Sequence, residues 1–200
     1  MTIKKRSVLL NRKGFGMNVS DSEKLILLML TELYDSVGVK GEIDPDFIRS
    51  AIFSDKTWSI PWKYYGIPFE DQDTPEVVKE VLDILEMWSV IESSYAELSD
   101  DEKDLVEKEA SPFGKKPTFK GFDGNNESEY MSTASFIVNE LERFEEFKGR
   151  NFNSHSQSID AYNRMKFVFE KIRKNIDFYP LNAQQLINLL KEKIHPDSRS

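Results

Sequence analysis

The chain has 200 residues, a formal net charge of −8 and no cysteine. Its 39% hydrophobic and 12% aromatic content is typical of a protein that folds around a core. The lack of cysteine excludes disulfides, thiolate metal sites and cysteine nucleophiles, and no apolar run is long enough to cross a bilayer. We therefore expect a soluble globular protein of the cytoplasm that does not bind membranes.

The charge is unevenly distributed along the chain. Residues 1–18 contain no acid and five bases, which are Lys4, Lys5, Arg6, Arg12 and Lys13. A basic arm of this kind can bind nucleic acid or another anion. Because the rest of the chain is acidic and repels phosphate, we interpret residues 1–18 as a flexible basic extension and do not expect nucleic acid as a partner.

The first helix is predicted from residue 20 to residue 37. Ser20 and Glu23 have the spacing of a capping box, and Gly38 is suited to end the helix. The residues between them are apolar on nearly every side of the helix, from Leu25 to Leu30 and again at Leu33 and Tyr34. Such a pattern is typical of a central helix, so we expect this helix to be buried.

A short helix and an aromatic segment come next. Asp44 and Pro45 are predicted to be the N-cap and first residue of a helix that ends near residue 53. Closely spaced prolines then exclude a long helix. The aromatic residues of this segment form a candidate interface: Trp58, Trp62, Tyr64, Tyr65 and Phe69. We interpret the segment as a loop folded onto the core or as a subunit contact, with a ligand-binding wall as the alternative.

The longest helix is predicted to begin at Thr74-Pro75 and to run to about residue 95. Its apolar stripe is wide enough for more than one neighbouring helix. Residues 99–110 are strongly acidic and begin with a second capping-box pattern, at Ser99 and Glu102. We expect a short surface helix or a solvated extension there.

A further helix is predicted from about residue 126 to residue 147, after an irregular crossover. Its main apolar seam is Tyr130, Ala134, Ile137, Leu141 and Phe144. A second stripe on another face is Phe136, Asn139, Arg143 and Phe147. Two seams on one helix predict two contact surfaces, and they place Asn139 and Arg143 in a partly buried position.

The last third of the chain contains a polar loop and two more helices. The loop covers residues 151–158, and the apolar positions of the first helix are Tyr162, Met165, Phe169, Ile172 and Ile176. The final helix is predicted to be capped by Asn182, with a seam at Leu186, Ile187, Leu190 and Ile194. No sustained period-two alternation predicts a sheet.

These elements predict an all-α fold. We expect a compact bundle of about six helices, with a long central helix and irregular aromatic and polar connecting loops. One helical domain is expected over residues 19–195, followed by a frayed tail at residues 196–200.

The chemistry available to this sequence is limited. It has two histidines, and no spacing typical of a metal site, a hydrolase elbow or a phosphate loop, so we predict no catalytic residue, metal or cofactor. One loose polar set remains: Asp123, Asn139, Arg143, Asn153, His155, Tyr162 and Arg164. It is either an anion or carbonyl pocket, with Arg143 as clamp and His155 as proton carrier, or a structural network that holds the loop at 149–158. We favour the structural network.

Several segments resemble the YfbU family. The strongest likeness is Phe119-Lys120-Gly121-Phe122-Asp123 with Glu127, and it continues through Phe152-Asn153 to Tyr162-Asn163-Arg164-Met165. Weaker likeness extends over most of residues 20–190. The resemblance implies a helical bacterial protein whose activity is uncharacterised, and it carries over no catalytic residue.

Three functions are compatible with the sequence. The first is a non-enzymatic protein that acts through self-association, as a dimer, and through a protein partner. The second is a nucleic-acid-binding regulator built from a helix-turn-helix-like N-terminal half and the basic arm, although residues 74–110 hold twelve acids and three bases. The third is a small-molecule sensor or enzyme with a pocket around Arg143 and His155. We favour the first.

Overall fold

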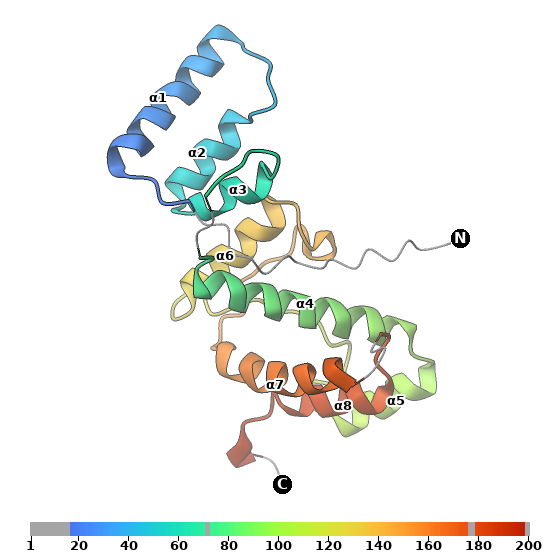
Figure 1. Ribbon diagram of the computed structural model, residues 1–200. Coiled ribbons are helices and arrows are strands. Elements are labelled where there is room, and N and C mark those ends of the chain that lie inside the picture. The colour runs from blue at the N-terminus through green and yellow to red at the C-terminus, as the bar shows by residue number, and fades with distance from the viewer. Residues whose placement is uncertain (1–16, 71–72, 176–178, 199–200) are drawn as a thin grey trace, which may run out of the picture. The chain divides into compact units, whose positions relative to one another are not determined.

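A computed structural model describes residues 17–70, 73–175 and 179–198 (Figure 1). The chain divides into two compact units, Met1–Glu76 and Val77–Ser200. The described residues form eight α-helices, three short 3₁₀ turns and no strand. The predicted all-α class is therefore confirmed. The helices outnumber the six or so expected, partly because the aromatic segment contains the four-residue helix α3.

The first unit contains α1 (Asp21–Val37), α2 (Pro45–Phe53), a 3₁₀ turn (Thr57–Ser59) and α3 (Ile60–Lys63). Both predicted starts are confirmed, since Ser20 and Glu23 form a capping box and Asp44 caps α2. Gly38 ends α1 with a φ of 67°. The helices α1 and α2 pack side by side (Figure 1), and Arg49 of α2 reaches Asp35 of α1.

The prediction that α1 is a buried central helix is wrong. Thr31 is its one buried residue, and most of its large aliphatic side chains are more than half exposed. An all-round apolar helix needs partners on several sides, whereas within its unit α1 packs along the nine-residue helix α2. One such neighbour covers one side of α1 and leaves the opposite side in solvent.

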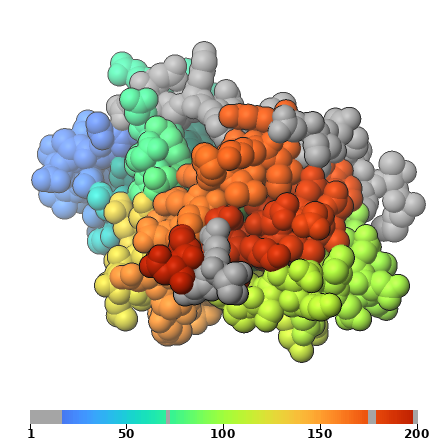
Figure 2. Space-filling view, turned by 90° about the horizontal axis from the view of Figure 1, so that it is seen from below, coloured from blue at the N-terminus to red at the C-terminus, as the bar shows by residue number. Residues whose placement is uncertain are grey.

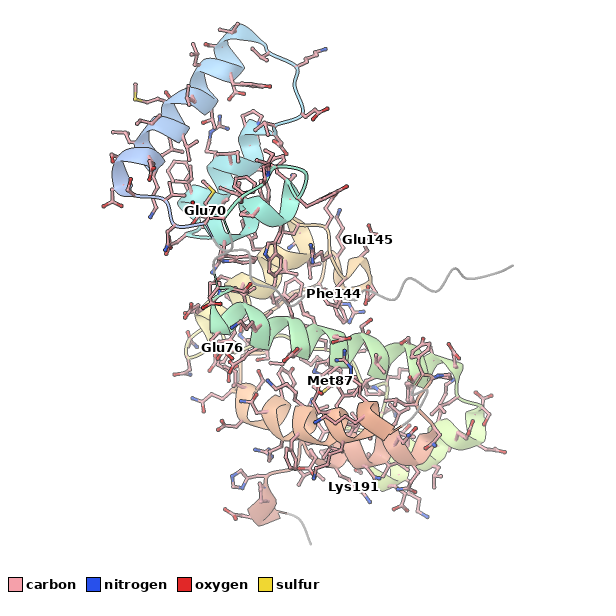
Figure 3. All side chains as sticks on the ribbon, viewed as in Figure 1. Glu70, Glu76, Met87, Phe144, Glu145 and Lys191 are labelled. Atoms are coloured by element: carbon pink, nitrogen blue, oxygen red, sulfur yellow. The ribbon has the colours of Figure 1, made fainter. Side chains whose placement is uncertain are left out.

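The second unit holds the larger core. It contains α4 (Glu76–Glu97), α5 (Asp100–Glu109), α6 (Ser128–Asn139), α7 (Ile159–Asn175) and α8 (Ala183–Lys191), with 3₁₀ turns at Glu145–Phe147 and Pro196–Ser198. The long helix α4 is buried along most of its length, and Met87, labelled in Figure 3, is fully buried. Helix α8 packs against both α5 and α7, and its surface is continuous with that of α5 in Figure 2.

The seams of α7 and α8 follow the prediction closely. Tyr162, Met165 and Phe169 are buried on α7, and Leu186, Ile187 and Leu190 are buried on α8. Asn182 caps α8 as predicted, in a capping box with Gln185. The predicted inward position Ile176 lies outside the described residues, as do residues 1–16 of the predicted basic extension and the last two residues of the predicted tail.

Helix α6 is shorter than predicted. It ends at Asn139, and the chain then takes left-handed backbone conformations at Glu142 and Phe144, the latter labelled in Figure 3. The N–H of Leu141 donates to the carbonyl of Phe136, and that of Arg143 donates to the carbonyl of Ile137. These bonds span five and six residues, so they close the helix instead of extending it.

One consequence is that the predicted second stripe does not exist as a helix face. Phe136 and Phe147 are both buried, as the apolar pattern required, but a 3₁₀ turn supplies Phe147. Asn139 is exposed, so the expectation that it lies partly buried is wrong. The apolar spacing therefore predicted correctly that both rings are buried. It predicted the backbone at Phe147 incorrectly, because a ring can be buried without lying on a helix.

Two loops that are far apart in the sequence are joined by a single parallel bridge between Phe122 and Asn153. The N–H of Phe122 donates to the carbonyl of Phe152 at 2.8 Å, and the N–H of Ser154 donates to the carbonyl of Phe122 at 2.9 Å. Gly121 precedes the bridge with a φ of 86°, and a Cβ placed there would lie 1.9 Å from the Phe152 carbonyl oxygen. The close approach of the two loops therefore requires glycine at this position.

Gly121→Ala should destabilise the protein severely. The left-handed φ costs alanine roughly 1–2 kcal/mol, and displacing the Phe152 backbone adds roughly 1–3 kcal/mol. The matched control is Gly149→Ala, which has a φ of 77° and nothing within 4 Å of the new methyl group. Denaturant unfolding of both variants measures the difference; equal losses of unfolding free energy would show that the contact with Phe152 is unimportant.

Candidate functional site

The bridge between the two loops positions three members of the predicted polar set. The side-chain oxygen of Asn153 accepts the backbone N–H of Gly124 and of His155, each at 3.0 Å. The phenol of Tyr162 donates to the carbonyl of Gly121 at 3.0 Å. Asp123, immediately after the bridge, is buried. The structure therefore brings Asp123, Asn153 and Tyr162 together around residues 121–124.

Asp123 is fully engaged with its own turn. Its carboxylate accepts the side-chain amide of Asn126 and the backbone N–H of Asn125. The bond from Asn126, then that from Asn125, and the nearby His155 hold the pKa of Asp123 below its usual value. Asp123 is thus an ionised group that fixes the turn before α6.

Tyr162 is also held in a structural position. Its ring packs against the rings of Trp88, Phe119 and Phe122, and its side chain is almost wholly buried. Burial raises the pKa of its phenol, so the phenol stays protonated and remains a hydrogen-bond donor to Gly121. The tyrosine connects α7 to the loop at residue 121.

The central carboxylate of this region is Glu127, which was not among the predicted polar set. Its Oε2 accepts the N–H of Asp123 at 2.9 Å and the hydroxyl of Ser158 at 2.8 Å. Its Oε1 accepts the N–H of Ser158 at 2.7 Å and of Ile159 at 2.9 Å, at the start of α7. One buried carboxylate therefore receives four hydrogen bonds and satisfies the otherwise unpaired amides of a helix N-terminus.

The charge state of Glu127 follows from these bonds. Burial by itself raises the pKa of this carboxyl, but the donors from Ile159, Asp123 and Ser158 outweigh it, and the net pKa lies below the usual value. One signal for this residue was present in the sequence, namely its place in the YfbU-like block. Spacing could not reveal its role because its donors at Ser158 and Ile159 lie 31 and 32 residues further along the chain.

The remaining members of the predicted set lie in other settings. Asn139 bonds to Ser135 within α6, and the Nε of Arg164 donates to the carbonyl of Glu192 at 3.0 Å. Arg143 lies beyond the end of α6, where burial lowers the pKa of its guanidinium. His155 has an exposed side chain on a residue with a φ of 54°. In the alternative interpretation, a pocket with Arg143 as clamp and His155 as proton carrier, the histidine side chain would therefore be exposed.

An ion pair that was not predicted from the sequence lies beside the bridge. Arg150 forms a two-pronged ion pair with Glu92 of α4, both bonds at 2.8 Å, and Glu92 also accepts the N–H of Phe119. The guanidinium lies over the ring of Phe147. A shallow depression of about 470 Å³ runs past Arg150, Lys120 and Asn153. Because the charges of Arg150 and Glu92 satisfy each other, the pair attaches the loop to α4.

Lys193 of the second unit lies against aromatic rings. The Nζ of Lys193 lies over the rings of Trp88 and Phe113, 5.1 and 4.7 Å from their centres. Burial, and then the neighbouring Lys120, lower the pKa of Lys193 to about 8. The two rings attract the ammonium form and so oppose this shift. The lysine covers the edge of the aromatic core.

The candidate interface residues of the aromatic segment differ in exposure. Trp58 is buried and meets Trp62 edge to face, and the hydroxyl of Tyr64 accepts the N–H of Asp44 at 2.9 Å. Trp62, Tyr64 and Phe69 are half-buried, whereas Tyr65 is 90% exposed. Tyr65 is therefore the ring of this set that offers most of its surface to a partner.

Among the described residues of the first unit, the most extensive apolar surface lies on α1. Six aliphatic side chains there are each more than half exposed: Leu25, Ile26, Met29, Leu30, Leu33 and Val37. At about 100° per residue, these six fall within a sector of about 140°, together with Ser22 and Ser36 and no charged residue. We call these six residues the α1 face. Figure 3 shows side chains projecting from α1 on the side away from α2.

The described residues contain neither a cluster suited to a metal ion nor a helix suited to cross a membrane. In residues 17–70, 73–175 and 179–198, no group of three or more histidine, aspartate or glutamate side chains is arranged to hold a metal ion. Over the same ranges, no helix combines the length and apolar character needed to cross a membrane.

The sequence from residue 55 to residue 191 identifies the family. A family model described as the YfbU domain matches residues 55–191, which include every residue of the Glu127 network. The chain belongs to the YfbU family. A relative described as UPF0304 protein MJECS11, from Methanocaldococcus jannaschii, is 29% identical over 116 residues, which are 55% of this chain and 64% of the relative. The chain therefore spans less than two thirds of that relative, and neither name states a reaction, ligand or partner.

The YfbU match also separates the two candidate regions. The network of Glu127, Asp123 and Tyr162 lies inside the matched residues, whereas the whole of α1 and of α2 precedes them. The resemblance read from residues 119–165 is thus confirmed at the level of the family. The α1 face lies outside the part of this YfbU chain that the family model describes.

Replacing Glu127 by glutamine should lower the free energy of unfolding at pH 7 by about 2–3 kcal/mol, because charged hydrogen bonds are lost and an amide N–H₂ meets a donor. The pKa of Glu127 is lower in the folded protein than in the unfolded chain, where it is about 4.3. Its charge therefore stabilises the fold fully above the unfolded pKa. This contribution is lost as the pH falls through the lower pKa of the folded state. Denaturant unfolding from pH 7 to pH 3 should show the gap to the native protein closing.

The control for this variant is Glu129→Gln, in the first turn of α6, where the carboxylate is exposed. It should change stability by less than about 0.5 kcal/mol throughout. A gap for Glu127→Gln that stayed constant with pH would contradict an ionised Glu127.

Proposed function

We propose that this YfbU-family protein is non-enzymatic and acts by self-association, with the α1 face as the surface that binds a second copy of the chain. The exposed, uncharged α1 face carries this proposal. A soluble chain rarely leaves six neighbouring large aliphatic side chains in water, and a contiguous patch of this kind marks an interaction surface.

The area of the α1 face fits a second copy. Six aliphatic side chains, each more than half exposed, present on the order of 500 Å² of apolar surface, as much as the largest patch on a typical monomer. Pairing two such faces buries on the order of 1,000 Å², which reaches the lower bound for a specific interface. Because each copy contributes the same face, pairing occupies both faces and the assembly stops at a dimer.

The charges around the α1 face favour a protein surface over an anionic one. Asp21, Glu23 and Glu32 are exposed on either side of it. The one base of α1, Lys24, lies near Asp21 and Asp55. These carboxylates at the edges of the α1 face would repel the phosphates of nucleic acid and of anionic lipid.

The polar network of the second unit supports the absence of catalysis. The carboxylates of Glu127, Asp123 and Glu92 each accept hydrogen bonds from the protein itself, and these bonds attach one loop or helix start to another. A catalytic acid or base needs an open hydrogen-bonding position for substrate. A protein partner that uses the exposed Tyr65, and residence in a reducing compartment such as the cytoplasm, complete the proposal.

Leu30→Lys should convert the dimer to a monomer. The lysine would bury an unpaired ammonium in the contact of each copy, so we expect the dimer dissociation constant to rise by about two orders of magnitude or more. Light scattering at micromolar concentration measures the mass, which should be twice 23.3 kDa for the native chain and 23.3 kDa for the variant.

The matched control is Leu105→Lys, which replaces a leucine on α5 that is also exposed. This variant should remain a dimer, and circular dichroism should show the same helix content for all three proteins. A native chain that is strictly monomeric at these concentrations would overturn the proposal.

A further inference from the structure

We propose that the two copies pair their α1 helices antiparallel across a two-fold axis, with a seam made by Ile26, Leu30, Leu33 and Val37. This inference rests on the proposed self-association and adds the orientation and register of the contact. The seam residues follow one another at spacings of four, three and four, which is the spacing that keeps two helices in contact along their length. Each of them is more than half exposed.

The charges at the two ends of α1 favour the antiparallel orientation. The first turn carries the exposed carboxylates of Asp21 and Glu23, and hydrogen bonds from Ser20 lower the pKa of Glu23, so it is ionised at neutral pH. The other end is close to neutral, because Arg49 pairs with Asp35 and the exposed base Lys40 is followed by the exposed Glu42. Antiparallel pairing brings Lys40 of one copy toward the acidic turn of the second, whereas parallel pairing places the two acidic turns together.

The helix dipoles add to the same preference. In an antiparallel pair, the positive N-terminal end of each helix lies beside the negative C-terminal end of the other.

The polar side chains at the two ends of the α1 face also permit close contact. The hydroxyl of Ser36 donates to the Leu33 carbonyl at 2.8 Å, and that of Ser22 lies 3.3 Å from the Ser20 hydroxyl. Both hydroxyls can therefore be covered without loss of their hydrogen bonds.

The midpoint of the seam fixes the register. It falls between Leu30 and Leu33, so an antiparallel two-fold pair places Leu30 of one copy opposite Leu33 of the second, and Ile26 opposite Val37. The two copies of Ile26 are then separated by eleven helical steps, roughly 16 Å along the helix. In a parallel pair, by contrast, each residue of the seam lies opposite itself.

Single cysteines distinguish these arrangements, because the native chain contains no cysteine and every disulfide formed is engineered. Ile26→Cys and Val37→Cys are prepared separately and oxidised alone and as an equal mixture. A disulfide requires Cα atoms within about 7 Å. We expect the mixture to give a disulfide between Cys at position 26 and Cys at position 37, identified by mass spectrometry. Each variant alone should cross-link no faster than the collision control Asp101→Cys, an exposed residue of α5.

In the mixture, the cross-link between positions 26 and 37 should exceed this control by at least tenfold. A dimer by light scattering in which each variant cross-links with itself would establish a parallel pair, and so overturn the antiparallel arrangement while leaving self-association intact. A dimer without any cross-link above control would overturn α1 pairing. A monomer by light scattering, with control-level cross-linking throughout, would overturn the self-association on which this inference depends.

Discussion

The carboxylate of Glu127 is the interaction on which the second unit depends. It is buried between the turn before α6 and the start of α7, and it receives donors from both sides. A buried charge is tolerated only where hydrogen bonds replace its water, so the positions of Asp123, Ser158 and Ile159 are fixed together. The bridge at Phe122 and the phenol of Tyr162 then follow from the same close approach of residues 121–124 to the loop at 152–154.

In this arrangement the polar residues that converge in the YfbU-like block bond within the protein itself. Asp123, Asn153 and Tyr162 do converge, but each directs its polar atom to a backbone group or to its own turn. The two-pronged pair of Arg150 and Glu92 has the same character, since it joins a loop to the long helix α4.

The first unit differs from the second in how its apolar surface is used. In the second unit, the apolar residues of α4, α7 and α8 are covered by one another. In the first, α1 carries as many large aliphatic side chains as a core helix but packs along one short helix. The surplus apolar surface is what a second copy would cover, and its position before the residues matched by the family model makes it a feature of this chain's N-terminal region.

The sequence by itself determined the helical class, the helix starts and most of the buried positions. Ser20, Asp44, Ser99 and Asn182 act through groups two or three residues away, so local spacing was enough to predict their caps. The tertiary structure alone decided that α1 is exposed, that α6 ends at Asn139 and that Glu127 is central. Those outcomes depend on which surface meets which and on donors some thirty residues away, and neither is encoded in the period of a single helix.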